Sequence, residues 1–334
     1  MEKRTTDIVS DTFYNPPTKS NWDGRNDGTA DEHLRWHQWV KLLHLDDLHT
    51  VNKRSIILLG FACDEGVIRN KGRLGASNAP LALRSALSNV PIPVNKIDIY
   101  DVGDVLCPNG DMETAQFRLA VVVKEILSSG NFPILIGGGH EISYGHYLGI
   151  AKYLNKEDTN LGIINFDAHF DIRKADENGN SSGTAFWQIA QHCKNKKQTF
   201  NYLALGIQRI SNTTHLFQTA NTLNVQYEFS DEFLAANKTR LQERIISFLK
   251  TTDHIYLTID MDVFAAAFAP GVSASAYNGI YPDDTFFSCL RTIINSKQTL
   301  SIDLAEVNPT YDLDNRTSKL AAAILFEIIT MIAD

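Results

Sequence analysis

Short hydrophobic runs rich in β-branched residues recur along the chain and alternate with longer segments of mixed polarity. They predict strands at residues 55–61, 96–103, 132–139, 161–168, 202–207, 255–263 and 300–307. Because most of these runs are continuously apolar, we expect strands that are buried on both faces of a parallel sheet. Helical periodicity at 112–129, 241–252 and 318–333 predicts helices that cover the sheet.

The chain shows no internal repeat and no Pro/Gly-rich linker, which favours one domain. We predict an α/β fold: a single three-layer α/β/α domain over residues 51–334 with a mostly parallel central sheet. Residues 1–50 contain few β-branched runs. We expect them to form an N-terminal extension that packs on the domain, because Trp22, Trp36 and Trp39 are costly to leave in water.

Composition limits the kinds of partner and the cellular compartment that we expect for this chain. The formal net charge is −8, with 39 acidic against 31 basic residues, so nucleic acid is not an expected partner. The chain offers no apolar run of about 20 residues for a membrane and no apolar leader near its start. Four isolated cysteines form no C-x-x-C pair and predict free thiols in a cytoplasmic protein: Cys63, Cys107, Cys193 and Cys289.

Candidate metal ligands follow three of the predicted strands. "GGGHE", "NFDAHFD" and "IDMD" supply His140, Asp167, His169, Asp171, Asp260 and Asp262. The carboxyl ends of parallel strands share the edge at which ligands bind. Four carboxylates packed there require a cation, and the oxygen-rich, imidazole-containing set suits Mn²⁺ better than thiolate-bound zinc. Fe²⁺ and Co²⁺ remain open.

Six side chains are too many for one ion that keeps an open coordination position. If Asp167 and Asp260 bridge, one site has His140 and Asp171 and the other has His169 and Asp262. Two Mn²⁺ per chain with a bridging hydroxide predict a hydrolase. Each motif alone is weak, since D-x-H is usually a solvated loop or helix cap and "GGGH" can be a simple tight turn. Their joint occurrence at strand ends is far more specific.

These three segments resemble the ureohydrolase family, which includes arginase, agmatinase and formimidoylglutamase. The resemblance extends to "RNKGRLGASNAPLALRSAL" and "DLAEVNPTYD" and covers most of the chain. It implies an arginase-like α/β/α domain and a two-manganese centre held by the six residues named above.

Within that family, "WDGRND", "GFACDEGVIRNKGR", "NFDAHFDIR" and "GNSSGTAFWQ" are most similar to formimidoylglutamases. That resemblance implies hydrolysis of N-formimidoyl-L-glutamate to formamide and L-glutamate, a step of histidine degradation. Two alternatives stay open: a hydrolase of a guanidino acid, agmatine or arginine that releases urea, and a non-catalytic metal-dependent scaffold. The expected partner is a small dicarboxylate amidine, and a homo-oligomer is compatible with the sequence.

Two departures from arginases bear on the substrate. Arg173 stands where arginases have an asparagine, and a guanidinium there favours a dicarboxylate through charge-assisted contacts. Its alternative role is to neutralise the ligand carboxylates or a surface neighbour. Ser182 stands where arginases have a histidine, and a hydroxyl cannot protonate a leaving amine near neutral pH. Asp171 or Asp262 would then supply the proton, while Ser182 either binds a substrate carboxylate or belongs to a polar loop.

The resemblance also assigns Glu306, which follows the run at 300–307, to pairing with the amidinium of the substrate. Weaker candidates for contacts with a substrate carboxylate are Arg69 and Arg73 in "RNKGR" and Asn180 in "GNSSG". Each of these three is equally compatible with a structural role.

Overall fold

The computed structural model describes residues 12–93, 95–155 and 159–334. In this part of the chain, ten strands form one sheet in the order β1-β4-β3-β5-β10-β9-β6-β7-β8, with β2 also paired to β4. Every pair of neighbours is parallel except β1 and β4. The strands are β1 (Tyr14–Asn15), β2 (Lys41–Leu42), β3 (Ile56–Ala62), β4 (Ile99–Leu106), β5 (Phe132–Ile136), β6 (Leu161–Phe166), β7 (Asn201–Ile207), β8 (Gln226–Phe229), β9 (His254–Asp260) and β10 (Thr299–Ala305).

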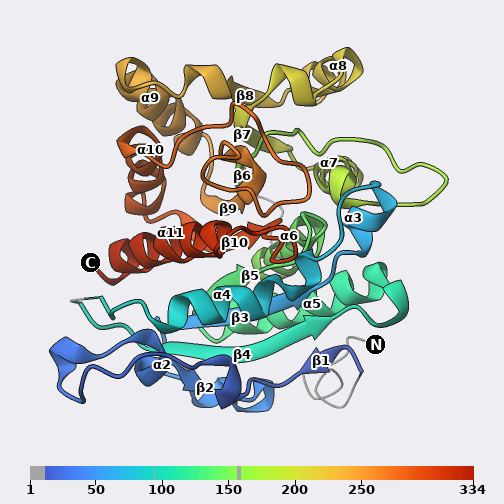
Figure 1. The fold of residues 1–334 in the computed structure, drawn as a ribbon. Helices are drawn as coiled ribbons and strands as arrows, with labels where there is room; N and C mark the ends of the chain where they lie inside the picture. The colour runs from blue at the N-terminus through green and yellow to red at the C-terminus, as the bar shows by residue number, and fades with distance from the viewer. Residues whose placement is uncertain (1–11, 94, 156–158) are drawn as a thin grey trace.

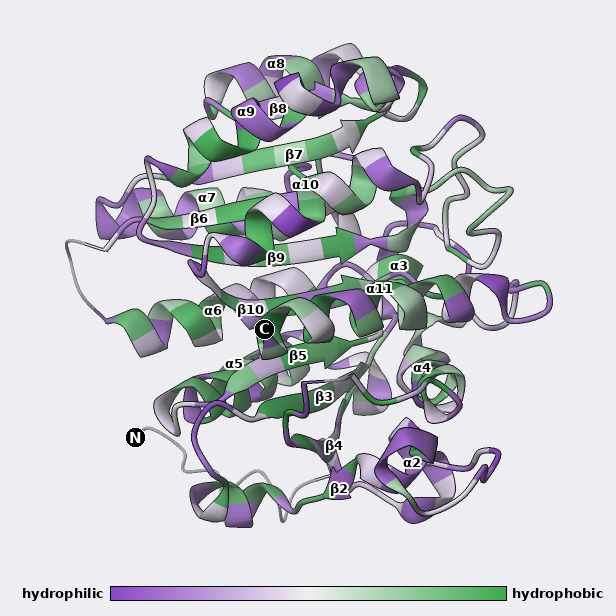
Figure 2. Ribbon diagram, turned by 90° about the vertical axis from the view of Figure 1, so that its left-hand side faces the viewer, coloured by the Kyte–Doolittle hydropathy of each residue, from purple (hydrophilic) through white to green (hydrophobic). Residues whose placement is uncertain are grey.

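Two layers of helices cover the sheet (Figures 1 and 2). One face packs against α4 (Ala79–Ser88), α9 (Lys238–Leu249), α10 (Asp284–Asn295) and α11 (Arg316–Ala333). The other packs against α5 (Met112–Ser128), α6 (Ile142–Leu154), α7 (Ala185–Lys196) and α8 (Thr214–Thr222). Two further helices are short: α2 (Trp36–Trp39), which contacts α4, and α3 (Glu65–Arg69). The predicted three-layer α/β/α fold with a mostly parallel sheet is confirmed.

Alternate side chains of one strand enter opposite cores, which explains the continuous apolar runs. In β3, Ile56 and Leu58 join the core beneath α4 and α11, while Ile57 and Leu59 join the core beneath α5 and α6. The central strands are accordingly coloured as mainly hydrophobic in Figure 2. Seven predicted strands correspond to β3, β4, β5, β6, β7, β9 and β10, and the three predicted helices correspond to α5, α9 and α11.

Four adjacent strands bring the candidate ligands to one edge of the sheet. β5, β10, β9 and β6 are neighbours in that order. Their last residues are in register: Ile136 pairs with Leu304, Ala305 pairs with Asp260, and Ile259 pairs with Phe166. The chain leaves all four strands at nearly the same level, so residues that follow them share one crevice.

The described part of the first fifty residues packs along β4, where β1 and β2 extend the sheet (Figure 1). Trp22 and Trp36 are buried, and Trp22 Nε1 donates a hydrogen bond of 2.8 Å to Asp101 Oδ2 in β4. The division of the chain at residue 50 stays a prediction, and residues 1–11 lie outside the described part. None of the described helices is both long enough and apolar enough to cross a bilayer.

Candidate metal centre and active site

A glycine turn after β5 delivers His140 to the crevice. Gly137 and Gly138 have φ values of 90° and 80°, a conformation that side-chain-bearing residues rarely adopt. At Gly139 a Cβ atom would lie 2.2 Å from Glu141 Oε2 and 2.4 Å from Val67 Cγ2, so a larger residue would displace these two side chains. The Gly139 amide donates to the Cys63 carbonyl at 2.9 Å. This hydrogen bond joins the turn to the residue that follows β3, directly before His140.

The segment after β6 carries Asp167, His169 and Asp171 into the same crevice. Asp167 is fully buried, and its Oδ1 accepts a 2.6 Å hydrogen bond from the His169 amide. Asn165 Nδ2 donates to Asp167 Oδ2 at 2.9 Å. Asp171 has a left-handed backbone (φ 49°), which is unusual for a non-glycine residue and directs its carboxylate back towards His140.

The end of β9 supplies the remaining pair. Asp260 is its last residue, and its Oδ1 caps the following turn by accepting from the Asp262 amide at 2.8 Å. Asp262 Oδ2 then lies 3.0 Å from His169 Nδ1. Both carboxylates are buried.

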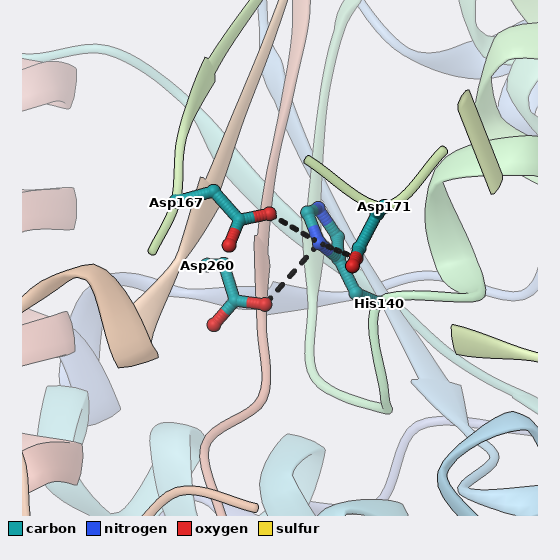
Figure 3. A group of neighbouring side chains, drawn as sticks. All are labelled: His140, Asp167, Asp171 and Asp260. Atoms are coloured by element: carbon teal, nitrogen blue, oxygen red, sulfur yellow. Dashed lines mark hydrogen bonds and ion pairs between the residues drawn. The ribbon is translucent and has the colours of Figure 1, made fainter. Parts of the chain in front are cut away.

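The six predicted ligands form two groups that share one residue. His140 Nδ1 faces three carboxylate oxygens, those of Asp171 at 2.9 Å, Asp167 at 3.1 Å and Asp260 at 3.2 Å (Figure 3). These four residues form the first group, and Asp167, His169 and Asp262 form the second. Within each group the donor atoms lie within 4.8 Å of one another, a spacing that suits ligands of one ion. Asp167 belongs to both groups, whereas Asp260 belongs only to the first.

The residues of this cluster change one another's pKa values. Burial alone would lower the pKa of His140, but its hydrogen bonds to Asp167, Asp171 and Asp260 outweigh burial and raise that pKa well above its ordinary value. Burial, reinforced by the charges of Asp262 and Asp167, raises the pKa of Asp260 well above its ordinary value. A divalent cation would neutralise these carboxylates in place of protons, so the donor set fits a metal centre.

Glu306 follows β10 and borders the first group. Its backbone is left-handed (φ 66°), and its Oε1 accepts from the His140 amide at 2.9 Å. Its Oε2 is buried and has no hydrogen-bond partner within the described part of the chain. Burial, then the charges of Glu141 and Asp262, raise the pKa of Glu306 to about 8. A buried acceptor without a donor costs stability, and a ligand N–H group would satisfy it.

A cavity of about 420 Å³ opens from this cluster. Its lining combines acidic and basic side chains. The residues that line it are Asn70, Lys71, Gly72, Arg73, His169, Asp171, Arg173, Ser182, Asp260, Asp262, Ser273, Ala274 and Glu306. Acidic side chains therefore share one small space with three cations, Lys71, Arg73 and Arg173. Such a cavity suits a ligand with both cationic and anionic groups.

The three cations of the cavity differ in their contacts. Arg73 Nε donates to the Ser273 carbonyl at 3.0 Å, and its guanidinium stacks 4.2 Å from the ring centre of Tyr311. In contrast, the side chains of Lys71 and Arg173 are exposed and have no hydrogen bond or ion pair among the described residues. Lys71 was not predicted from the sequence. Its only signal was a cation directly before Gly72, where the left-handed backbone of Lys71 (φ 62°) turns the chain.

Of the other residues predicted to contact the substrate, one lines the cavity and two do not. Ser182 lines the cavity, and its Oγ accepts from Asn70 Nδ2 at 3.2 Å. Asn180 and Arg69 do not line the cavity. Arg69 forms ion pairs with Glu65 and Glu113, and its Nη1 donates to the Asn180 carbonyl at 3.2 Å. Their predicted contact with a substrate stays a prediction, while their observed contacts join α3 to neighbouring loops.

Comparison with known proteins places this geometry in a family. Residues 54–331 match the arginase family. The chain is 40% identical over 329 residues to a formimidoylglutamase of Clostridium tetani, covering 96% of each chain. It is 43% identical over 320 residues to a formimidoylglutamase of Geobacillus sp., covering 95% of this chain and 96% of the relative.

The fold is also similar to that of a solved enzyme. A crystal structure of Trypanosoma cruzi formiminoglutamase with Mn²⁺ matches with a TM-score of 0.75 at 23% identity, covering 87% of this chain and 98% of that chain. The predicted family relationship is confirmed by the sequence matches. This chain belongs to the arginase family.

Proposed function

We propose that the chain hydrolyses a C–N bond of N-formimidoyl-L-glutamate and releases formamide and L-glutamate. The observation that carries this proposal is the cavity that is lined both by the acidic cluster and by Lys71 and Arg173, two cations whose side chains have no other described partner. The proposed substrate has a cationic amidine and two carboxylates, so its charges complement those of the lining. The similarity to relatives named formimidoylglutamase over nearly the full chain supports the same substrate.

We propose two Mn²⁺ ions as the cofactor. The first would be held by the group around His140 and the second by the group around His169, with Asp167 contributing to both. When bound, such a pair supplies Lewis acidity that activates a water molecule near neutral pH. Each of the six side chains lies at or shortly after the end of a strand, and sites built on such regular elements hold their groups in place.

Glu306 is suited to hold the amidine. Its Oε2 is buried beside the first group and has no hydrogen-bond partner among the described residues. There it would accept an N–H hydrogen bond from an amidinium. An ionised carboxylate and an amidinium form a charge-assisted pair of fixed geometry. Glu306 thereby orients the amidine carbon towards the acidic cluster, and Asp171 or Asp262, which also line the cavity, would pass a proton to the leaving amine of glutamate.

Lys71 and Arg173 are suited to bind the two carboxylates. Both line the cavity and neither is neutralised by another described residue. Arg73 contributes less, because Ser273 and Tyr311 already hold its guanidinium. Ser182 and Asn70 add neutral hydrogen-bonding groups to the lining of the same cavity. This division explains how the cavity would select a dicarboxylate over a cationic amine.

We further propose that the enzyme acts in histidine degradation in the cytoplasm. The substrate is an intermediate of that pathway, and the four cysteines are free thiols, as a reducing compartment requires.

Turnover of a substrate panel tests the proposal. Protein stripped with a chelator and reloaded with Mn²⁺ is assayed on N-formimidoyl-L-glutamate, L-arginine, agmatine and 4-guanidinobutyrate. We expect formamide and glutamate from the first substrate, no urea from the others, and no turnover before reloading. Urea from any guanidine, with no product from the amidine, would overturn the substrate assignment.

A further inference from the structure

Behind His140, a hydrogen-bonded chain of buried side chains runs away from the cavity. His140 Nε2 lies 3.0 Å from Thr258 Oγ1, and Thr258 Oγ1 donates to Asp303 Oδ1 at 2.6 Å. Thr258 in β9 and Asp303 in β10 are register partners, and neither side chain is exposed to solvent. This series of hydrogen bonds therefore lies within the buried interior, between the neighbouring strands β9 and β10.

Both carboxylate oxygens of Asp303 have hydrogen-bond partners. Besides the hydroxyl of Thr258, its other oxygen lies 2.5 Å from the Tyr256 hydroxyl and 2.5 Å from His146 Nδ1. His146, on α6, is itself held through Nε2 by Ser301 Oγ at 2.5 Å. Two hydroxyl groups, those of Thr258 and Tyr256, therefore donate to this carboxylate from the neighbouring strand β9.

The direction of this hydrogen bond decides which nitrogen of His140 carries a hydrogen. The hydroxyl hydrogen of Thr258 points towards Asp303 Oδ1. The Thr258 oxygen then offers a lone pair to His140, so Nε2 of His140 carries the hydrogen. In a neutral imidazole this leaves the lone pair on Nδ1, the nitrogen that faces Asp167, Asp171 and Asp260.

We propose that Asp303 is a positioning residue for the first metal site, acting through Thr258 to fix the tautomer and ring orientation of His140. This inference rests on the metal centre proposed above. With the opposite tautomer, Nδ1 would donate its hydrogen to a ligand carboxylate and could not bind a cation. Partners of this kind behind a metal-binding histidine raise affinity and order the site.

Binding of Mn²⁺ alone, measured by isothermal titration calorimetry on protein stripped of metal, tests this role. Thr258→Val keeps the side-chain shape but removes the hydroxyl, and we expect it to weaken binding at the first site about 10- to 100-fold. Thr258→Ser restores the hydroxyl and should bind nearly as the parent protein does. Tyr256→Phe is the matched control, because it removes one hydroxyl donor to Asp303 without cutting the connection to His140.

The binding results distinguish a positioning role of Asp303 from a general disruption of the core. Weakened binding in Thr258→Val, with near-parental binding in both Thr258→Ser and Tyr256→Phe, supports the proposal. Parental affinity in Thr258→Val would overturn it, and so would equal losses in the valine and phenylalanine variants, because core disruption would then be the cause. If Thr258→Val does not fold by circular dichroism, Thr258→Ala replaces it in the same comparison. A parent protein that binds no Mn²⁺ would instead refute the metal centre.

Discussion

The roles of Lys71 and Arg173 can be separated by removing one charge from the protein and one carboxylate from the substrate. Lys71→Met and Arg173→Met each delete a cation that lines the cavity and has no other described partner. If each cation binds one carboxylate, each variant loses activity only on substrates that keep the matching carboxylate.

The expected size of the loss follows from the exposure of the two side chains. A hydrogen bond to a charged group contributes about 1.5–3 kcal/mol. Both side chains are exposed to solvent, which screens the interaction, so the lower end of that range applies. About 1.5 kcal/mol corresponds to roughly a tenfold fall in kcat/KM for each variant. Because the carboxylates lie at different ends of the substrate, the double variant should lose about a hundredfold.

The assay compares three amidines: the N-formimidoyl derivatives of L-glutamate, of 4-aminobutyrate, which lacks the α-carboxylate, and of L-2-aminobutyrate, which lacks the γ-carboxylate. Lys174→Met is the control, because Lys174 is exposed beside Arg173 but lies over the Trp187 ring and outside the cavity. The reasoning is refuted if both single variants stay within about twofold of the parent on the dicarboxylate. Equal losses on all three amidines would also refute it.

Three other substitutions test separate parts of the account. Glu306→Gln keeps the acceptor for the His140 amide but removes the charge that faces the amidinium, and should lower kcat/KM about 100-fold with unchanged manganese content, as measured by steady-state kinetics and elemental analysis. Asp262→Asn weakens the group around His169, so mass spectrometry should find about one Mn²⁺ per chain, against the two that we expect for the parent. Arg84→Met leaves two buried carboxylates, Asp101 and Asp104, without their ion-pair partner, and should reduce the free energy of unfolding in urea by about 3–5 kcal/mol.

Much of the fold and the metal cluster follows from local patterns in the sequence. Continuous apolar runs predict strands buried on both faces, and polar residues directly after those runs predict a shared site, because parallel strands end at one edge. His140, Asp167 and Asp260 were predicted in this way, and the structure places one oxygen of Asp167 and one of Asp260 within 3.2 Å of His140 Nδ1.

Other residues carry no comparable signal. Lys71 reaches the cavity through a left-handed backbone within a turn that only tertiary contacts define. Thr258 and Asp303 stand inside apolar strands, and a polar residue in a buried strand indicates a hydrogen-bond partner without naming it. Arg69 resembled Arg73 in the sequence, yet it does not line the cavity and instead forms ion pairs with Glu65 and Glu113, which lie on two different helices.

The most direct test of the central claim is which C–N bond of the substrate breaks. N-formimidoyl-L-glutamate labelled with ¹³C at the amidine carbon is incubated with the Mn²⁺-loaded protein, and the products are followed by ¹³C NMR. The account predicts that the label appears in formamide, with one equivalent of glutamate. Label in N-formyl-L-glutamate, with release of ammonia, would contradict it.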